Sequence, residues 1–470
     1  MMKKITYLVG SLLLFAATGH AYTNTLNQEI PVIWRTLWEF QSMPQHFIDY
    51  DGREGNFSSL YGGQTFYDYH RLYEPNSVIL FGGIFETFRR LNENTRLYAA
   101  IDFRNSYHRN QYRSIEKDFY ASYIVFSDTT EGDFQFNGPL IDFLYSQDLT
   151  ERLTMGLKIN YGVEQGIKDV YTQARIRELN SDLTVSARYN VFSSLNIDAW
   201  FRRYRGRSTF EAVKEYQDAL VWTWIGYSVF RPENPGSSID TERNKNGYNM
   251  GSGVLYRSVG SPLSMYIGLS QGVEQNDARK GSRSDTSQRG FWQRNGYEGF
   301  LWMKYGRPDY ALTLFGLLCQ NNDWGKTGRY NAVFMEYDES LFQGGMGIDL
   351  YFRENSSMSL SLRSGSFKYD YTDYLSRETY ASEEMSWRGS LDLAYRPFPV
   401  TSWLAGASAE KIPLHFTWDV TSMIRYLIYA GFEYQLGLSR ICPSLYYNLD
   451  IPDGSVKNNS TWHVKLTLMR

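Results

Sequence analysis

The residue types that most often do chemistry in proteins are sparse in this chain and lack the spacing that such chemistry needs. Beyond residue 21 the histidines are scattered, with no two at a metal-ligand spacing: His46, His70, His108, His415 and His463. The chain has no Gly-x-Ser-x-Gly elbow, no His-Glu-x-x-His sequence and no phosphate-binding loop. We therefore expect no catalytic residues, no metal site, no cofactor and no enzyme.

The thiol chemistry is equally limited, because Cys319 and Cys442 are the only cysteines in 470 residues. This count excludes a disulfide scaffold and any site that needs several thiolates, such as an iron-sulfur cluster. The two residues lie far apart in segments that alternate like strands. We interpret them as small strand side chains, while a disulfide is permitted but not indicated.

Charged residues are more informative, because they recur at alternate positions of segments that resemble β-strands. The polar phase of these segments carries Arg96, Asp102, Arg104, Lys158, Arg188, Asp198, Arg202, Glu298, Lys304, Asp349, Arg353, Arg363, Arg388, Asp392, Arg396, Glu433 and Lys465. Inside a barrel, such charges either brace the interior or line a polar channel, and both interpretations stay open. The densest cationic group, Arg202 to Arg207, could attract lipopolysaccharide phosphates or an anionic solute. The totals, 48 Lys and Arg against 51 Asp and Glu, give no footprint for nucleic acid.

The segments that carry these residues alternate strictly between apolar and polar side chains. From Leu153 to Val163, every odd-numbered residue is apolar and every even-numbered residue is polar or small. The same period of two recurs in segments of about nine to twelve residues, the length that a tilted strand needs to cross a bilayer. We predict the first strand at Phe57 to Tyr67, paired with Val78 to Leu91, and the last at Thr461 to Met469.

The connections between the segments are short and long in alternation. Short turns join the segments in pairs at Leu91 to Asn94, Asp148 to Arg152, Ser193 to Leu195, Gly260 to Pro262, Gly306 to Asp309, Glu354 to Ser356, Pro397 to Thr401 and Leu436 to Ser439. Long polar stretches separate the pairs at His108 to Asp118, Gln165 to Asp182, Gln275 to Gly296 and Lys368 to Glu384. This asymmetry is typical of an outer-membrane barrel. Aromatic residues at the short-turn ends predict an interfacial girdle: Phe192, Tyr305, Phe352, Tyr395, Phe398 and Trp403.

Three segments break the alternation. Asp133 to Leu149 changes phase at Gly138-Pro139, which predicts a β-bulge, and Tyr310 to Asn322 is apolar on both faces, so its orientation is unassigned. Ala219 to Phe230, inside the longest interval between predicted strands, is apolar and uncharged. A solvent-exposed loop should not display such a surface. It is either a strand pair covered by neighbouring loops or, as we slightly favour, a loop that folds into the barrel mouth and narrows it with Trp222, Trp224 and Tyr227.

The N-terminus predicts export. Lys3 and Lys4 precede an apolar run from Leu8 to Ala17, and Gly19 and Ala21 place small residues where a signal peptidase cleaves. We predict a cleaved signal peptide over residues 1–21. Residues 22–56 lack alternation and are expected to stay in the periplasm or to enter the lumen as a small plug. Residues 57–470 are expected to form the barrel.

The fold class follows from the hydrogen bonds that backbone groups need when they lie in lipid. Beyond the signal peptide the sequence has no apolar run of 18 or more residues, so a transmembrane helix is not available. In lipid only a closed sheet then satisfies every backbone N–H and C=O group. We predict an all-β protein: a transmembrane antiparallel up-and-down barrel of about 16 to 18 strands, integral to a Gram-negative outer membrane.

Five segments have a characteristic texture and spacing: Phe85 to Leu91, Leu97 to Asn105, Asp128 to Asp133, Tyr161 to Glu164 and Asn180 to Leu183. In these segments the chain resembles an uncharacterised outer-membrane β-barrel family of the Bacteroidota. This resemblance implies the location and the fold, with no established substrate. One departure is that the last strand ends Leu468-Met469-Arg470, whereas such barrels usually end in an aromatic residue that the barrel assembly machinery reads.

Three classes of function remain, and fold alone does not decide among them. We expect a porin-like channel or conduit for uptake or export of a small solute or a hydrophobic ligand. The alternative is an accessory or adhesion barrel whose loops bind a partner protein, such as a TonB-dependent receptor or a surface lipoprotein. An outer-membrane lipase is least favoured, because hydroxyl groups near His70 or His415 are too common to be informative. Expected partners are outer-membrane lipid, lipopolysaccharide and the assembly machinery.

Overall fold

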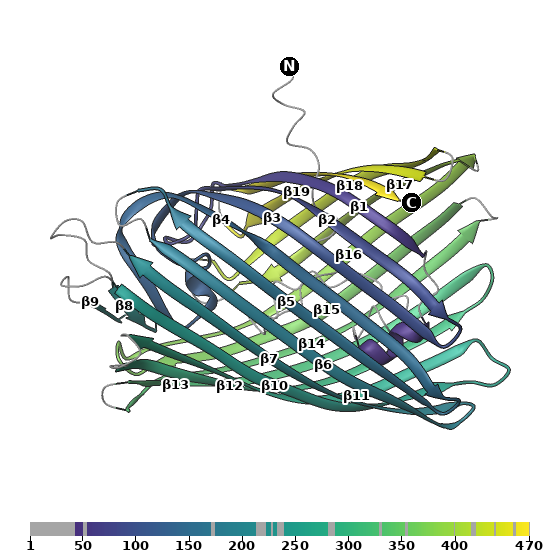
Figure 1. The fold of residues 1–470 in the computed structure, drawn as a ribbon, viewed down its shortest axis with the longest axis horizontal. Helices are drawn as coiled ribbons and strands as arrows, with labels where there is room; N and C mark the ends of the chain where they lie inside the picture. Colours follow the sequence, from purple (N-terminus) through teal and green to yellow (C-terminus); the bar gives the residue numbers. More distant parts are fainter. Residues whose placement is uncertain are drawn as a thin grey trace, which may run out of the picture.

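A computed structural model describes residues 43–49, 54–170, 174–212, 222–226, 229–232, 239–280, 287–328, 331–352, 356–398, 400–414, 420–436, 439–454 and 457–469. Within these ranges the strands form one antiparallel sheet that closes into a barrel of 18 strands (Figure 1). The predicted signal peptide, residues 1–21, lies outside the described residues. No helix in the described ranges is long and apolar enough to cross a membrane.

The barrel wall runs in chain order. Its strands are β1 (Gly55–Tyr67), β2 (Ser77–Asn92), β3 (Thr95–Ser114), β4 (Ile124–Thr150), β5 (Leu153–Lys168), β6 (Arg175–Phe192), β7 (Leu195–Ala212), β10 (Ile239–Arg257), β11 (Leu263–Lys280), β12 (Ser287–Gly306), β13 (Tyr310–Thr327), β14 (Val333–Phe352), β15 (Ser356–Asp373), β16 (Glu378–Phe398), β17 (Thr401–Pro413), β18 (Ser422–Leu436), β19 (Ser439–Pro452) and β20 (Asn459–Met469). Two further strands, β8 (Trp222–Ile225) and β9 (Val229–Pro232), pair with each other at one end of the barrel.

Closure depends on β1, which pairs with both β2 and β20. At this seam Ser59 lies opposite Thr467, and the Ser59 hydroxyl donates a hydrogen bond of 3.0 Å to Thr467 Oγ1. A closed sheet leaves no edge with unpaired backbone groups. The predicted fold class and strand number are therefore confirmed. The strand ends that the eight short turns join lie at one end of the barrel, the short-turn end, and the strand ends that the remaining connections join lie at the other, the long-loop end.

The strands are longer than predicted. The strands of the barrel wall span from 11 residues in β20 to 27 in β4. Most of each stretch predicted as a long polar loop is strand: β11 continues to Lys280 and β12 starts at Ser287 within the predicted loop Gln275 to Gly296. The prediction is wrong there because beyond an apolar band the outer face also becomes polar, so the alternation fades while the backbone pairing continues.

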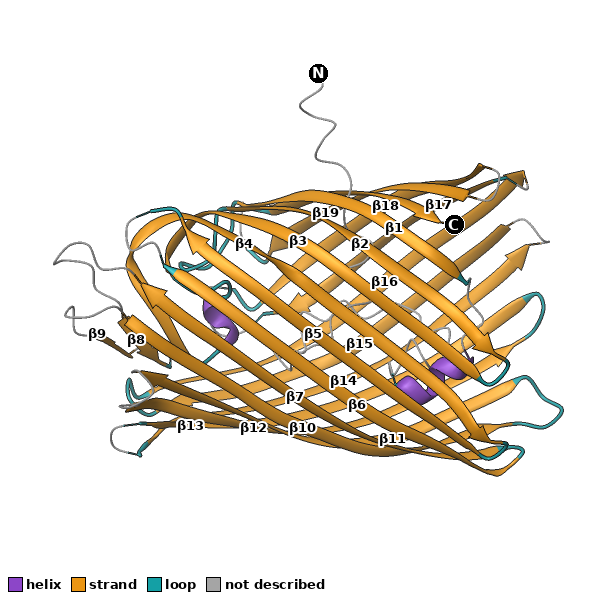
Figure 2. Cartoon of the chain, in the orientation of Figure 1, coloured by secondary structure: helices purple, strands orange, loops and turns teal. Residues whose placement is uncertain are grey.

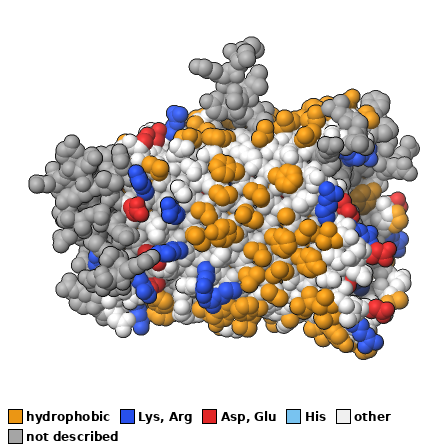
Figure 3. Space-filling view, in the orientation of Figure 1, with side chains coloured by type: hydrophobic (Ala, Val, Ile, Leu, Met, Phe, Trp, Pro, Cys, Tyr) orange, Lys and Arg blue, Asp and Glu red, His pale blue; other side chains and the backbone are white. Residues whose placement is uncertain are grey.

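The outer surface has an apolar band. Ile267, Leu301 and Leu393 are exposed on the outer face, whereas their neighbours Tyr266 and Trp302 are buried inside. Figure 3 shows apolar side chains across the middle of one face, with charged side chains gathered toward the two ends. Such a band flanked by charges is what a hydrocarbon layer requires of a barrel. Of the aromatic residues predicted for a girdle, Tyr305 is half-buried, the side chain of Phe398 lies outside the described residues, and four are exposed: Phe192, Phe352, Tyr395 and Trp403.

The interior contains apolar clusters as well as polar residues. The largest, here called the mouth cluster, lies at the long-loop end and consists of Ile115, Tyr123, Ile124, Phe126, Phe134, Phe136, Ala174, Ile176, Phe210, Ala278, Trp292, Cys319, Phe334, Met335, Tyr337, Leu341, Phe367, Tyr369 and Tyr371. A second joins residues of β7 and β10 to β13: Trp200, Leu255, Tyr266, Phe300, Trp302 and Phe315. A third lies around Phe47, Tyr61 and Tyr98.

These clusters explain the two strands whose phase was difficult to predict. In β4, burial alternates without interruption from Gly132 to Ser146, and Gly138 and Pro139 pair with consecutive residues of β3. The predicted bulge is therefore wrong. Phe134 and Phe136 point inward into the mouth cluster, so the apolar residues change face while the strand keeps its phase. In β13, Phe315 and Cys319 likewise point inward, and Leu318 is exposed outside.

Candidate functional site in the barrel lumen

The segment Ile115–Ser127, here called the mouth segment, folds into the long-loop end of the barrel. It comprises the connection after β3, the short helix η4 (Phe119–Ala121) and the first residues of β4. The Tyr123 hydroxyl donates a hydrogen bond of 3.0 Å to Asp323 of β13, and its ring contacts Trp292 and Tyr371 of β12 and β15. The segment thus reaches across the lumen from β3 to the opposite wall.

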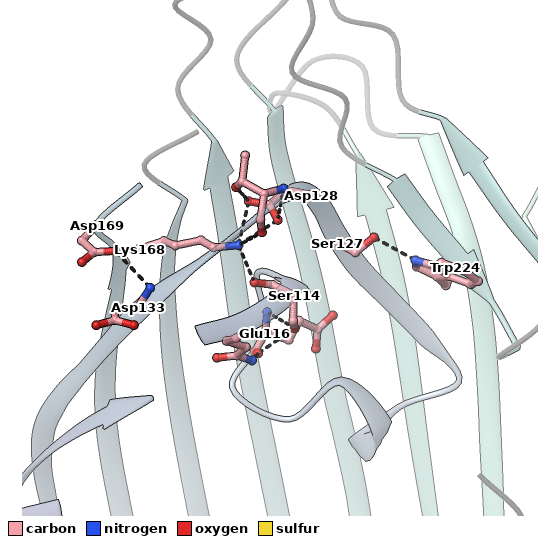
Figure 4. A network of polar contacts seen from close by, with 10 residues as sticks. Ser114, Glu116, Ser127, Asp128, Asp133, Lys168, Asp169 and Trp224 are labelled. Atoms are coloured by element: carbon pink, nitrogen blue, oxygen red, sulfur yellow. Dashed lines mark hydrogen bonds and ion pairs between the residues drawn. The ribbon is translucent and has the colours of Figure 1, made fainter. Parts of the chain in front are cut away.

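A buried lysine holds both ends of the mouth segment against β5 (Figure 4). Lys168 Nζ donates to Asp128 Oδ1 at 2.8 Å, to the Ser114 carbonyl at 3.3 Å and to the Thr130 carbonyl at 2.6 Å. The side chains of Lys168 and Asp128 are both fully buried. Removing one partner of such a pair leaves a buried charge uncompensated, which typically costs about 3–5 kcal/mol. The pair therefore fixes the position of the segment.

Glu116 ties the middle of the mouth segment to the wall. Its Oε1 accepts a hydrogen bond of 2.8 Å from the Phe126 N–H, and its Oε2 lies 2.7 Å from Arg243 Nη1 of β10. Burial raises the pKa of the Glu116 carboxyl from 4.5 to about 7, because the loss of hydration outweighs the favourable contacts with Arg243 and the Phe126 N–H. The charge of this carboxyl therefore changes close to neutral pH.

The predicted constriction residues lie beside the mouth segment. Strand β8 pairs with Ile124–Ser127, and Trp224 Nε1 donates a hydrogen bond of 2.8 Å to Ser127 Oγ (Figure 4). The Trp224 ring packs edge-on against Phe119 and Tyr73. Trp222 is half-buried on the same strand, and Tyr227 lies outside the described residues.

Sequence reasoning missed the mouth segment itself. Its core, Phe119 to Phe126, contains no charge and is mostly aromatic or aliphatic. This is the same signal that singled out Ala219 to Phe230, so it could have identified the segment.

A second element enters the lumen near the short-turn end. The short helix η3 (Pro44–Asp49) contacts β3 to β6 and lies inside the barrel (Figure 2), so residues 43–49 of the predicted N-terminal segment are in the lumen. His46 Nε2 lies 3.0 Å from Asp198 Oδ2, and Arg188 Nη1 lies 2.9 Å from Asp49 Oδ2. Burial, helped by the nearby Arg188, lowers the pKa of His46 from 6.5 to about 4. His46 is therefore neutral at pH 7, and its contact with Asp198 is not an ion pair.

The two sides of the lumen differ. The inner faces of β4 to β7 and β10 to β15, here called the packed wall, lie under the mouth cluster, the second apolar cluster and η3. The inner faces of β16 to β19 toward the short-turn end, here called the open wall, carry half-buried polar side chains: Asp392, Tyr429, Tyr446 and Asn448. Among the described residues of the lumen, these polar side chains therefore keep part of their surface accessible to solvent.

A row of charged residues starts on β15 of the packed wall and crosses β16 to β19 on the long-loop side of the open wall. Strand register places its members side by side in the order Arg363, Arg388, Glu410, Arg425 and Asp450, on β15 to β19. Glu410 Oε2 lies 3.6 Å from Arg363 Nη2 and 3.3 Å from Arg388 Nη1. Glu410 Oε1 lies 3.6 Å from Arg425 Nη1. Arg425 also donates to both carboxylate oxygens of Asp450, at 2.7 and 3.1 Å. We call these five residues the charged row.

The other predicted lumen residues are distributed over the inner face. Arg202 pairs with Asp182, Asp102 accepts a hydrogen bond of 2.5 Å from the Tyr61 hydroxyl, and Asp392 accepts one of 2.6 Å from Tyr429. The other predicted residues that lie on inner faces are Arg96, Arg104, Lys158, Glu298, Asp349, Lys304, Arg396, Glu433 and Lys465. Arg353 lies outside the described residues. The structure brings together two predicted pairs, Arg188 with Asp198 and Arg363 with Arg388.

The cationic group Arg202 to Arg207 is divided between the two faces of β7. Arg202 points into the lumen, whereas the side chains of Arg203, Arg205 and Arg207 are exposed outside.

The described residues offer no metal centre. Within those ranges no three His, Cys, Asp or Glu side chains are grouped so that they could hold a metal ion. Cys319 is buried in the mouth cluster and Cys442 is half-buried on β19, and the two do not form a disulfide with each other.

Comparison with protein families assigns the chain to one family. Residues 50–437 match a family described as a family of unknown function, DUF6850. The chain belongs to this family. Comparison of this DUF6850 member with curated proteins finds no match.

Solved structures similar to this DUF6850 member are outer-membrane barrels. The ferric preacinetobactin receptor BauA of Acinetobacter baumannii is 6% identical with a TM-score of 0.42, over 88% of this chain and 80% of that one. The transporter YddB of Escherichia coli is 8% identical with a TM-score of 0.42, over 89% and 81%. The ferric enterobactin receptor PfeA of Pseudomonas aeruginosa is 11% identical with a TM-score of 0.42, over 89% and 81%.

Proposed function

We propose that this barrel is a conduit of the outer membrane and that a small solute passes through it along the open wall. The observation that carries the proposal is the asymmetry of the lumen. Apolar clusters and inserted elements fill the side of the packed wall, whereas the open wall keeps polar side chains half-exposed. Polar side chains that face free space in a barrel lumen are the usual lining of an aqueous path.

The inserted elements make the conduit narrow and controllable. The mouth segment covers the long-loop end of the packed wall and η3 lies near the short-turn end, so both elements narrow the lumen beside the open wall. Both elements are joined to the wall by a few buried polar contacts, such as those of Lys168 and Arg188. Elements held in this way can be released together when such contacts change.

Conductance across a planar bilayer tests the proposal. The purified full-length barrel should first run faster on an SDS gel before boiling than after, which shows that it is folded. We expect small, steady conductance from the wild type and larger conductance after Phe119–Ile124 is replaced by a Gly-Ser linker of equal length. A folded wild type and a folded linker variant that are both electrically silent would exclude the conduit.

The second candidate is an accessory barrel whose loops bind a partner protein, such as a TonB-dependent receptor or a surface lipoprotein. The mouth cluster favours it, because nineteen buried residues fill part of the long-loop end. For this function the linker replacement should abolish partner capture and leave conductance at zero. The same bilayer experiment therefore separates the two candidates.

The outer face of β7 supports a location in the outer membrane and lipopolysaccharide as a partner. Arg203, Arg205 and Arg207 are exposed at the long-loop side of Phe201, which belongs to the apolar band. Guanidinium groups at this level suit the phosphates of lipopolysaccharide. Recovery of the protein in the outer-membrane fraction is expected, and recovery as a soluble periplasmic protein would refute the assignment. Export by a signal peptide, assembly by the barrel machinery and an origin in the Bacteroidota stay predictions.

A further inference from the structure

We propose that the charged row is a binding site for an oxyanion, of which a carboxylate is the best match, and that it makes the conduit selective for anionic solutes. This inference rests on the proposed function, because it names the class of solute that would use the open wall.

The first argument is the arrangement of charge. Arg363 and Arg388 lie directly opposite each other on neighbouring strands, and like charges in that position repel. Asp450 neutralises Arg425 through a two-fold hydrogen bond, so Glu410 is the remaining carboxylate for the other two arginines. Three cations face two anions across the row, and the excess is one positive charge.

The second argument is the number of unused donors. A guanidinium offers about five N–H donors in a planar fork that matches a carboxylate. Arg363 Nη1 and Arg388 Nε are both buried and have no hydrogen-bond partner among the described residues. Unsatisfied buried donors cost free energy, so they call for an explanation in terms of what they bind. A carboxylate placed between the two guanidiniums would satisfy both and remove the repulsion.

The third argument is the contrast with arginines on the packed wall. Arg294 forms two hydrogen bonds, of 2.7 and 2.6 Å, with its own carboxylate on Asp323. Arg202 is paired in the same way with Asp182. These pairs need no further anion, whereas Arg363 and Arg388 share one carboxylate at 3.6 and 3.3 Å.

The fourth argument is position. On the outer face beside the row, Leu362, Trp387 and Tyr426 are exposed, so the row is at the level of the apolar band. The half-buried residues Asp392 and Tyr429 follow toward the short-turn end, and the Asp392 carboxylate is occupied by the Tyr429 hydroxyl. A solute that enters at the long-loop end meets the row before the rest of the open wall.

The test measures ion selectivity in a potassium chloride gradient across a planar bilayer. We expect the wild type to prefer chloride and expect Arg363→Gln and Arg388→Gln each to reduce the chloride-to-potassium permeability ratio several-fold. Glu410→Gln should shift the ratio in the opposite direction, because it removes the shared negative charge. The matched control is Arg203→Gln on the outer face, which should leave the ratio unchanged. All variants must show heat-modifiable migration, as a check of folding.

A binding measurement separates the site from the conduit. Acetate and inorganic phosphate should each raise the thermal unfolding temperature of the detergent-solubilised wild type but not that of the Arg363→Gln/Arg388→Gln double variant, and the larger shift identifies the preferred oxyanion. Equal shifts in the wild type and the double variant, or permeability ratios that do not change with Arg388→Gln and Glu410→Gln, would overturn the site and leave the conduit standing. Specific stabilisation in a barrel that does not conduct would keep the site and refute the conduit.

Discussion

The packed wall and the open wall belong to one continuous sheet, yet their inner faces follow different rules. On the packed wall, bulky residues such as Tyr266 and Phe334 are fully buried, and Arg294 has a carboxylate of its own on Asp323. On the open wall, polar side chains are half-exposed, and along the charged row that borders it two arginines share Glu410. The difference shows that a barrel strand can serve as a core on one side of the lumen and as a channel lining on the other, depending on what is folded against it.

Truncation of a large side chain on each wall should give the largest contrast. Phe126 is fully buried in the mouth cluster, so Phe126→Ala should destabilise the docked mouth segment by about 3–5 kcal/mol. Leu427 is half-buried on the inner face of β18, and Leu427→Ala should cost less than about 1 kcal/mol. Denaturant unfolding of the reconstituted barrel measures both. Similar losses would show that the two walls are equally packed.

The mouth segment should respond to pH through Glu116, which faces Arg243 of β10 and Glu178 of β6. The docked carboxyl has a raised pKa, so its contribution to docking is fully present below pH 4.5 and is lost as the pH rises toward about 7. The full loss is roughly 3 kcal/mol. Conductance should therefore increase from pH 5 to pH 8, and Glu116→Gln should remove the increase. An increase that persists in the variant would exclude Glu116 as its origin.

The docking of helix η3 should depend on pH in the opposite direction, becoming weaker as the pH falls. Docked His46 has a pKa of about 4 instead of 6.5, so its contribution to docking is present above pH 6.5 and is lost as the pH falls toward 4. The loss is again roughly 3 kcal/mol. Although burial opposes it, Arg188 and Arg257 hold the pKa of Asp49 below its usual value, and this acts in the same direction. Protease cleavage near η3 should increase at pH 4.5. Cleavage that is greater at pH 8 would contradict the assignment.

A serine-to-arginine substitution on each wall gives the best-matched comparison and the smallest expected effect on stability. Ser186 is buried and accepts a hydrogen bond of 3.1 Å from the Gln45 N–H of η3, whereas Ser390 is half-buried beside Ser361. Ser186→Arg should cost about 1–3 kcal/mol because the new side chain displaces η3. Ser390→Arg should change stability by no more than about 0.5 kcal/mol. Thermal unfolding of both variants measures the difference, and a larger cost at Ser390 would reverse the comparison.

The sequence predicts the wall of the barrel well, because the wall depends on a period of two that every strand repeats. The first and last strands, the short turns and the inner phase of residues such as Arg188 and Arg388 follow from that period alone. The period stops being informative where both faces are polar, which is why β11 and β12 are longer than predicted. It misleads where the interior is apolar, as at Phe134 and Phe136.

The site was harder to predict, because it depends on contacts between residues that are far apart in the chain. Tyr123 and Asp323 are 200 residues apart, and no local pattern indicates that they form a hydrogen bond. The charged row shows the same limit. Alternation places Arg363 and Arg388 inside, but the exact register of four strand pairs is needed to show that both depend on Glu410.

The seam between β1 and β20 has a consequence for how the molecule is made. It joins residues about 400 positions apart, such as Ser59 and Thr467, so β1 has no second partner until β20 has arrived. Until then the sheet has two free edges, each able to pair with another chain. Contacts of such sequence separation also form slowly. The unfinished chain must therefore be shielded from its neighbours while it folds. Substitutions that weaken the seam should lower the yield of assembled protein before they affect the barrel once it has formed.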